Sequence, residues 1–123
     1  MTITRVSAEL LVADHAAAVS WYRTLFGRPA DEEPMAGLAE WQITASGWLQ
    51  VSENADQAGQ SAATIGVDDL DQHAAGLAAR GVELQRQTTT RGQKLGIIND
   101  PDGNLIVFAQ DLVSSRSRKE AGQ

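Results

Sequence analysis

The stretch NDPDGNLIVFAQ, residues 99–110, joins a tight turn to a strongly apolar strand. Aspartate, proline and glycine favour turns, because proline fixes φ and glycine accepts left-handed backbone. The strand that follows alternates little between apolar and polar residues, so both of its faces are expected to be covered. One face should pack on a helix, and the other must meet a metal ion, a small molecule or further core.

Upstream of this stretch, the first half of the chain has the pattern of one strand, one helix and two further strands. Asp14 is a suitable helix cap, and Gly27 is a suitable helix stop. The expected elements are a strand at 5–12, a helix at 15–27, a loop at 28–37 and strands at 38–44 and 48–54.

After a polar linker at 55–61, the pattern of a strand and a helix starts again and is followed by three strands. Asp68 or Asp69 caps the second helix and Gly81 stops it, and the cap-to-stop spacing from Asp68 equals that from Asp14 to Gly27. The expected elements are strands at 62–67, 82–90, 93–99 and 104–110, with a helix at 68–81. We therefore predict an α+β domain over 4–111, built from βαβββ modules at 4–54 and 61–111, and a disordered tail at 112–123.

The charge of the chain limits its partners. The formal net charge is −6, and the tail from Ser114 holds three cationic residues and one acidic residue, so the remaining residues carry −8. An acidic body argues against a nucleic-acid partner and tolerates a cationic or neutral small molecule, although it can also serve solubility alone. No apolar run is long enough to cross a membrane. The chain has no cysteine, which is compatible with the cytoplasm, where we expect it.

Three motifs together resemble the vicinal oxygen chelate superfamily, the glyoxalase/bleomycin-resistance/dioxygenase group. They are LLVADHAAAVSWYRTLFG at 10–27, IGVDDLDQHAAGLAARGVEL at 65–84 and DPDGN at 100–104. The resemblance covers residues 5–110. It implies a curved mixed sheet in each module with the helix outside, and a cupped cavity formed by the two modules. Many members are homodimers, so we also expect a homodimer.

The resemblance further implies four positions at which metal-dependent members place metal ligands. In this chain they are Ser7, Gln50, Ala62 and Val107. Divalent ions need several imidazole or carboxylate donors, and alanine and valine supply none. His15 and His73 fall in the helices, away from the expected cavity. We therefore predict no metal and no other cofactor.

Strand parity selects the side chains that should face the cavity, because alternate residues of a strand share one face. The cavity set comprises small, apolar and amide side chains with one acid: Ser7, Glu9, Trp48, Gln50, Ala62, Thr64 and Val107. This composition suits an apolar or flat ligand. Glu9 is open to several roles: pairing with a nearby cation, simple hydration, contact with a ligand, or general-base catalysis.

Two further residues, Trp41 and Lys94, are candidates for ligand binding. Trp41 and Trp48 lie on neighbouring strands and are candidates for stacking on a planar ligand, or for filling the core or a dimer interface. Lys94 is a candidate for the cavity mouth, with Arg91 nearby, or is simply a solvated strand end.

Two hypotheses of function follow, and a third stays open. The first is a metal-free binding protein that sequesters a small apolar or aromatic molecule, the role that the resemblance gives to bleomycin-resistance members. The second is a lyase, isomerase or dioxygenase of the same superfamily, dependent on a divalent metal or using Glu9 as base. The third is a regulatory or structural dimer with a vestigial cavity. We favour the first and lean against an enzyme.

Overall fold

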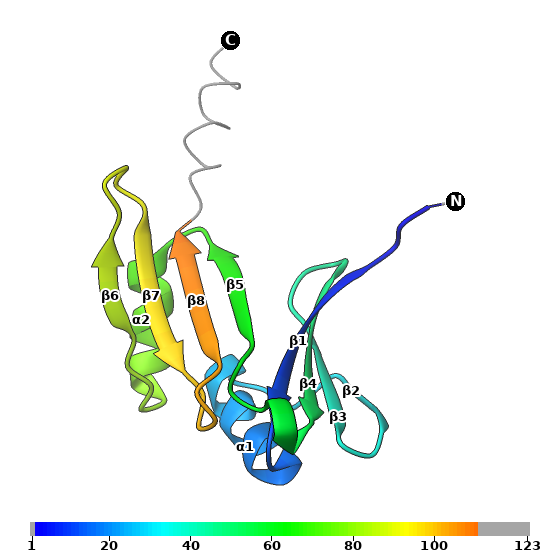
Figure 1. The fold of residues 1–123 in the computed structure, drawn as a ribbon. Coiled ribbons are helices and arrows are strands. Elements are labelled where there is room, and N and C mark those ends of the chain that lie inside the picture. The colour runs from blue at the N-terminus through cyan, green and yellow to red at the C-terminus, as the bar shows by residue number, and fades with distance from the viewer. Residues whose placement is uncertain (1, 111–123) are drawn as a thin grey trace. The chain divides into compact units, whose positions relative to one another are not determined.

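A computed structural model describes residues 2–110, so the predicted tail lies outside the described residues. The two halves have the same order of elements (Figure 1). The first half comprises β1 (Val6–Val12), α1 (His15–Phe26), β2 (Glu32–Met35), β3 (Leu38–Gln42), β4 (Gly47–Glu53) and the short 3-10 helix η1 (Ala55–Gln57). The second half comprises β5 (Ala62–Val67), α2 (Leu70–Ala79), β6 (Gln85–Thr88), β7 (Lys94–Asn99) and β8 (Leu105–Gln110).

Each half builds one four-stranded sheet with the same strand permutation. The first sheet has the order β1-β4-β3-β2 and the second has the order β5-β8-β7-β6. In the first sheet β1 pairs in parallel with β4, whereas β3 pairs antiparallel with both β4 and β2. The α+β fold of two βαβββ modules predicted from the sequence is therefore confirmed.

Helix α1 forms where the sequence signals predicted it. The Asp14 side chain accepts a hydrogen bond from the Ala17 N–H at 3.2 Å, and Gly27 ends the helix with φ of 72°. The helix buries Ala18, Tyr22 and Leu25 against one face of the first sheet. That face supplies the apolar core of the first half, with Leu10, Val12, Ala39, Trp41, Leu49 and Val51 all buried.

One prediction about the first half was wrong: residues 28–37 are not all loop, because β2 lies within them. All four residues of β2 are exposed, so no apolar alternation marks the strand in the sequence. It is the outer strand of the sheet and contains Pro34, which an edge strand tolerates. Backbone pairing with β3 holds it, and the sequence carries no side-chain signal for that pairing.

Helix α2 resolves the choice between two predicted caps in favour of Asp69, whose side chain accepts from the Gln72 N–H at 3.0 Å. Leu70 and Leu77 are its fully buried residues. On the second sheet, Ile106 and Phe108 of β8 are also buried, and the Phe108 ring lies 4.5 Å from the His73 ring of α2. These contacts identify the face of the second sheet that α2 covers.

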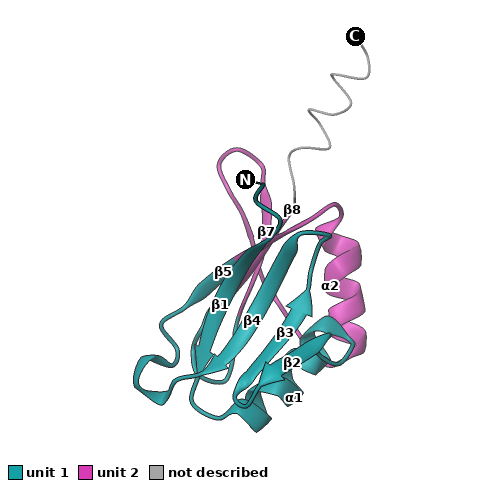
Figure 2. Cartoon of the chain, turned by 90° about the vertical axis from the view of Figure 1, so that its right-hand side faces the viewer, with its two compact units in different colours: residues 1–63, 99–105 teal, residues 64–98, 106–123 magenta. Residues whose placement is uncertain are grey.

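The chain divides into two compact units that do not coincide with its two halves (Figure 2). Among the described residues, 2–63 and 99–105 form the first unit, and 64–98 and 106–110 form the second. The turn of the DPDGN motif therefore belongs to the first unit, although it lies between two strands of the second sheet. Among residues 2–110, no helix is long and apolar enough to span a bilayer.

Asp100 and Asn104 explain how this turn is held. The buried Asp100 carboxylate accepts hydrogen bonds from the Tyr22 hydroxyl at 2.7 Å and from the backbone N–H groups of Asp102 and Asn104. The fully buried Asn104 side chain donates to Asp100 and to the Leu11 carbonyl oxygen, and it accepts from the Ser61 N–H. Burial, and then the bond to Asp100, raise the pKa of Tyr22. Tyr22 thus stays neutral and acts as a structural donor.

Candidate functional site

The face of the first sheet opposite α1 carries mainly polar side chains in regular cross-strand rows. Directly paired residues of neighbouring strands share one face, so the register places nine positions in three cross-strand rows. We call this surface the polar face; its rows are Ser7–Trp48–Gln42, Glu9–Gln50–Glu40 and Leu11–Ser52–Leu38. The alternate residues of β1 and β4, such as Leu10 and Val51, are buried on the α1 side.

A guanidinium group lies on the polar face. The Arg5 guanidinium carbon stands 4.1 Å from the centroid of the Trp48 ring, which is a cation–π distance. The Nη2 atom of Arg5 donates to Glu40 Oε2 at 2.8 Å, and its Nε donates to Ser7 Oγ at 3.1 Å. Gln50 Nε2 donates to the same Glu40 oxygen at 2.6 Å. Glu40 is only 5% exposed, so this buried carboxylate is held by one cation and one amide.

A pocket of about 390 Å³ adjoins this cluster on the first unit. Its lining combines two carboxylates, one hydroxyl, three apolar side chains and one glycine: Glu9, Glu53, Ser52, Met35, Ala36, Leu38 and Gly37. Met35 is 66% exposed, which is high for so large an apolar side chain. Glu9 is exposed, and its side chain has no hydrogen-bond or ion-pair partner within residues 2–110. The pocket therefore offers a free carboxylate beside apolar surface.

The structure brings together four of the residues selected from the sequence, and it separates Trp41 from them. Ser7, Glu9, Trp48 and Gln50 lie on the polar face. Trp41 is fully buried on the α1 side, where its ring lies 6.1 Å from that of Tyr22 and its indole N–H donates to the Arg28 carbonyl oxygen. Trp41 thus occupies the core, which the sequence left open for it beside stacking on a ligand and a dimer interface.

The remaining selected residues belong to strands of the second sheet. Ala62 and Thr64 are exposed on β5, and Val107 is partly exposed on β8. Lys94 donates to Asp71 of α2 at 3.1 Å, so its side chain extends toward the helix-covered face. The Arg86 and Lys94 cations lower the pKa of Asp71 through hydrogen bonds, Arg86 contributing more.

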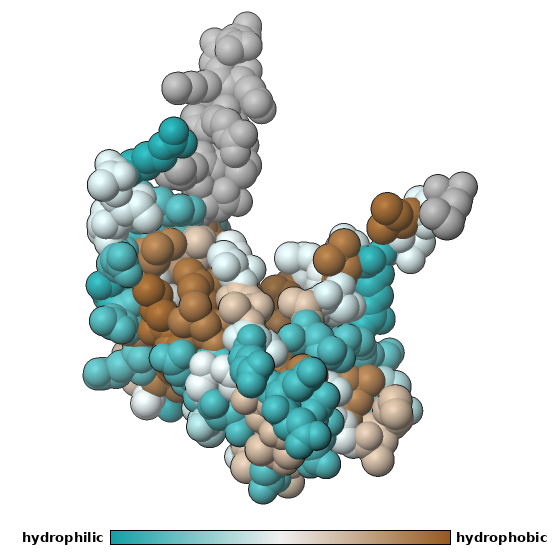
Figure 3. Space-filling view, viewed as in Figure 1, coloured by the Kyte–Doolittle hydropathy of each residue, from teal (hydrophilic) through white to brown (hydrophobic). Residues whose placement is uncertain are grey.

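The helix-free face of the second sheet is mainly apolar. A Cβ atom added to Gly96 would meet Leu70 of α2 at 3.3 Å, so Gly96 faces the helix and its neighbours in β7 point away. The exposed or partly exposed apolar residues of this face are Leu95, Ile97, Leu105 and Val107, beside the small Ala109. Figure 3 shows a hydrophobic patch over β7 and β8 on this side of the sheet.

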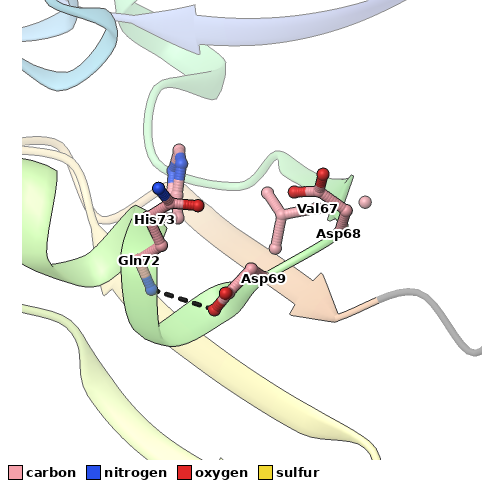
Figure 4. Close-up of a pocket in the computed structure, with 6 residues that line it drawn as sticks. Val67, Asp68, Asp69, Gln72 and His73 are labelled. Atoms are coloured by element: carbon pink, nitrogen blue, oxygen red, sulfur yellow. Dashed lines mark hydrogen bonds between the residues drawn. The ribbon is translucent and has the colours of Figure 1, made fainter.

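A second pocket, of about 490 Å³, lies on the second unit at the start of α2 (Figure 4). It is lined by Gly66, Val67, Asp68, Asp69, Gln72 and His73. The Asp69 carboxylate is already engaged as the helix cap. Burial, and secondarily the charge of Arg80, lower the pKa of His73, so the ring stays neutral. None of the residues selected from the sequence lines this pocket.

Sequence reasoning missed Arg5 and Glu40. Both could have been found by parity: Arg5 precedes Ser7 by two residues, and Glu40 adjoins Trp41, whose burial points Glu40 to the opposite face. The sequence does not indicate on which face of the sheet the Trp41 side chain lies, because LAEWQIT has no clear apolar alternation.

The donor groups present do not fit the metal centre of metal-dependent relatives. At the four corresponding positions Ser7 and Gln50 offer one hydroxyl and one amide oxygen, and Ala62 and Val107 offer no donor. Within residues 2–110 no three histidine, cysteine or carboxylate side chains gather closely enough to hold an ion. Glu40, the one buried carboxylate of the polar face, is already paired with Arg5.

The chain resembles known proteins in both sequence and structure. A family model described as Glyoxalase/Bleomycin resistance protein/Dioxygenase superfamily matches residues 3–108. A glyoxalase/bleomycin resistance protein from Catenulispora acidiphila DSM 44928 is 33% identical, with a TM-score of 0.82 over 87% of this chain and 97% of the other. No curated protein matched the chain.

Two more distant structures share the fold at 18% identity. A bleomycin-binding protein complexed with bleomycin has a TM-score of 0.72, over 87% of this chain and 98% of the other. Lactoylglutathione lyase from Agrobacterium tumefaciens has a TM-score of 0.73, over 92% of this chain and 97% of the other. At this identity the likeness concerns the fold alone, and binding proteins and enzymes both appear.

Proposed function

We propose that this chain, which belongs to the Glyoxalase/Bleomycin resistance protein/Dioxygenase superfamily, binds and sequesters a small aromatic or apolar molecule instead of transforming it. The observation that carries the proposal is the polar face of the first sheet. There the Trp48 ring presents its flat side to a planar group, at present the Arg5 guanidinium, beside the pocket that contains Glu9. An aromatic platform with few orienting polar groups suits ligand binding.

The second sheet supports the same kind of ligand. Its helix-free face offers a hydrophobic patch of Leu95, Ile97, Leu105 and Val107, with Thr64 supplying a hydroxyl on β5. Burying apolar ligand surface there is favourable by roughly 25 cal/mol for each Å² removed from water. Ala62 is exposed and small, so it leaves room for a ligand. The buried Trp41 and the helix-directed Lys94 are left out of the proposed site.

A specific observation favours a second candidate, an enzyme of the superfamily that uses Glu9 as a general base. Glu9 is exposed, lines a pocket and has no partner within the described residues, so its carboxylate is free to accept a proton from a substrate. This candidate predicts that Glu9→Gln abolishes turnover while leaving ligand binding in place. Turnover that survives Glu9→Gln would eliminate it. The residues at the four metal-ligand positions do not support a metal-dependent enzyme.

The experiment that tests the binding proposal follows the three indole N–H signals in ¹⁵N NMR spectra while aromatic compounds are added. The panel contains bleomycin, indole and 2-naphthol. We expect saturable shifts of the Trp48 signal, whereas the Trp41 signal should stay in place because its N–H is bonded to Arg28 in the core. Binding of a responding compound, measured by calorimetry, should be lost in Trp48→Leu and retained in Trp21→Phe, the matched control on α1. If no compound moves the Trp48 signal, the proposal fails.

We also propose that the protein is a homodimer, as the resemblance of the sequence implies, and that it is cytoplasmic, with which the absence of cysteine is compatible. Size-exclusion chromatography with light scattering measures the mass in solution against the 13.1 kDa of one chain. A mass of one chain at micromolar concentration would contradict the dimer.

A further inference from the structure

We propose that Arg5 is an internal occupant of the ligand site, and that the site selects ligands carrying a planar cation, a guanidinium or an amidinium group. Such a ligand would displace Arg5 from Trp48 and Glu40. This inference rests on the proposed function, because it specifies the ligand class of the same site.

The contacts of Arg5 define what the site recognises. An aromatic face, a carboxylate oxygen and a hydroxyl receive the guanidinium at 4.1 Å, 2.8 Å and 3.1 Å, through Trp48, Glu40 and Ser7. A flat cation satisfies all three at once: its plane lies on the ring while its N–H groups point outward to the acceptors. An ammonium group lacks the flat face, and a neutral amide lacks the charge.

Glu40 makes the cation necessary. Its carboxylate is 5% exposed, and among residues 2–110 the only side chain besides Arg5 that donates to it is the neutral Gln50. A buried charge without a counter-charge is costly, so departure of Arg5 leaves a site that favours another cation. Glu9 lies on the other side of Gln50 in the same cross-strand row and adds negative potential.

Arg5 is placed so that it can leave without disrupting the sheet. It precedes β1, whose pairing with β4 begins at Val6, and the segment before β1 continues beyond the end of the first sheet (Figure 1). Its side chain is 36% exposed, although its partner Glu40 is buried. A rotation of the segment before Val6 therefore frees the ring of Trp48 while the strand register stays intact.

The test compares benzamidine with benzamide, its neutral analogue of nearly the same shape, by titration of the Trp48 indole N–H signal. In the full chain Arg5 competes with benzamidine, which lowers the apparent affinity by the fraction of molecules in which the site is free. We expect Arg5→Ala to raise the affinity for benzamidine about tenfold and to change that for benzamide much less. Arg23→Ala, which removes an exposed arginine from α1, should change neither affinity.

A second variant separates the role of Glu40 from that of the aromatic ring. Glu40→Gln in the Arg5→Ala background keeps the size of the side chain and removes its charge, so the preference for benzamidine over benzamide should be lost. An unchanged Trp41 indole signal in each variant verifies that the core remains folded. Arg5→Gln, which retains a donor toward Glu40 without the cation, should behave as Arg5→Ala does.

Four results would overturn the inference, and three of them concern the variants. One is an unchanged or weaker affinity for benzamidine in Arg5→Ala. Another is an equal gain for benzamide, which would leave aromatic binding standing without cation selection. The last is a preference for benzamidine that survives Glu40→Gln. A Trp48 signal that responds to the aromatic panel but not to benzamidine would likewise remove the inference alone, whereas a signal that responds to nothing removes the proposed function.

Discussion

Asn104 is fully buried, and each polar atom of its side chain has a partner within the first unit. Its Nδ2 atom lies 2.7 Å from the Leu11 carbonyl oxygen and 2.7 Å from Asp100 Oδ2, and its Oδ1 lies 2.9 Å from the Ser61 nitrogen. The side chain therefore joins the last turn of the described chain to β1 and to the linker before β5.

Asn104→Ala should lower the free energy of unfolding by about 2–4 kcal/mol, because it leaves buried backbone and carboxylate groups without partners. Urea denaturation followed by circular dichroism measures the change. Asn99→Ala is the matched control, since Asn99 is exposed in the same turn and makes one longer bond of 3.3 Å to the Gly103 oxygen. Equal losses in the two variants would contradict this account of the turn.

At the level of single residues, the sequence predicted those side chains whose position follows from strand period alone. Ser7, Glu9, Trp48 and Gln50 share a face because parallel pairing of β1 with β4 keeps two-residue periods in step. The contact of Arg5 with Glu40 could not be predicted, because it joins residues 35 positions apart across strands that are not neighbours in the sheet. Such a contact depends on side-chain length and rotamer, and the local pattern of apolar and polar residues does not determine the rotamer.

The ends of the helices were the features best predicted from the sequence, because a capping side chain bonds to backbone only a few residues away. Asp14, Asp69 and Gly27 have the roles predicted for them. Strand β2 shows the opposite case, because an exposed edge strand needs no particular side chains and therefore leaves no pattern.

The two helices allow a paired test of glycine. Gly27 has a φ of 72°, where a Cβ atom is strained, so Gly27→Ala should destabilise the protein by about 1–2 kcal/mol. Gly76 lies inside α2 and a Cβ there would meet nothing within 4 Å, so Gly76→Ala should stabilise it by about 0.5–1 kcal/mol. Thermal unfolding compares the variants, and shifts of the same sign would refute the assignment.

The packing of α2 on β8 should make stability depend on pH. Burial, followed by the Arg80 charge, lowers the pKa of His73, and its Nε2 atom has no hydrogen-bond partner among the described residues. As pH falls through the ordinary histidine value of about 6.5, the unfolded chain binds a proton that the folded chain does not, so the free energy of unfolding decreases. Because the ring is only partly buried, we expect a loss below about 1 kcal/mol.

Urea denaturation between pH 7 and pH 5.5 measures this dependence, and His73→Gln should reduce its slope. His15→Gln is the matched control, and it should leave the change of unfolding free energy with pH as it is in the unsubstituted protein. A slope that is unchanged in His73→Gln would show that this ring does not contribute.

For the whole molecule, charge and donor composition lead to one prediction about metals. The chain carries a net charge of −6, yet no three potential ligand side chains gather within residues 2–110. Metal-stripped protein titrated with Ni(II), Zn(II), Mn(II) and Fe(II) by calorimetry should therefore show no stoichiometric submicromolar binding. Tight binding of one ion per chain would overturn the proposed metal-free function and direct attention to lyase and dioxygenase assays.

The placement of residues 99–105 in the first unit has a consequence for dividing the chain. A fragment that ends in the linker near Gly59 would contain β1 to β4 and α1, but it would lack Asp100 and Asn104. The Tyr22 hydroxyl and the Leu11 carbonyl oxygen would then lose the partners that now bind them. Cutting the chain in the linker therefore does not yield an independent first unit, because that unit includes a turn encoded after β7.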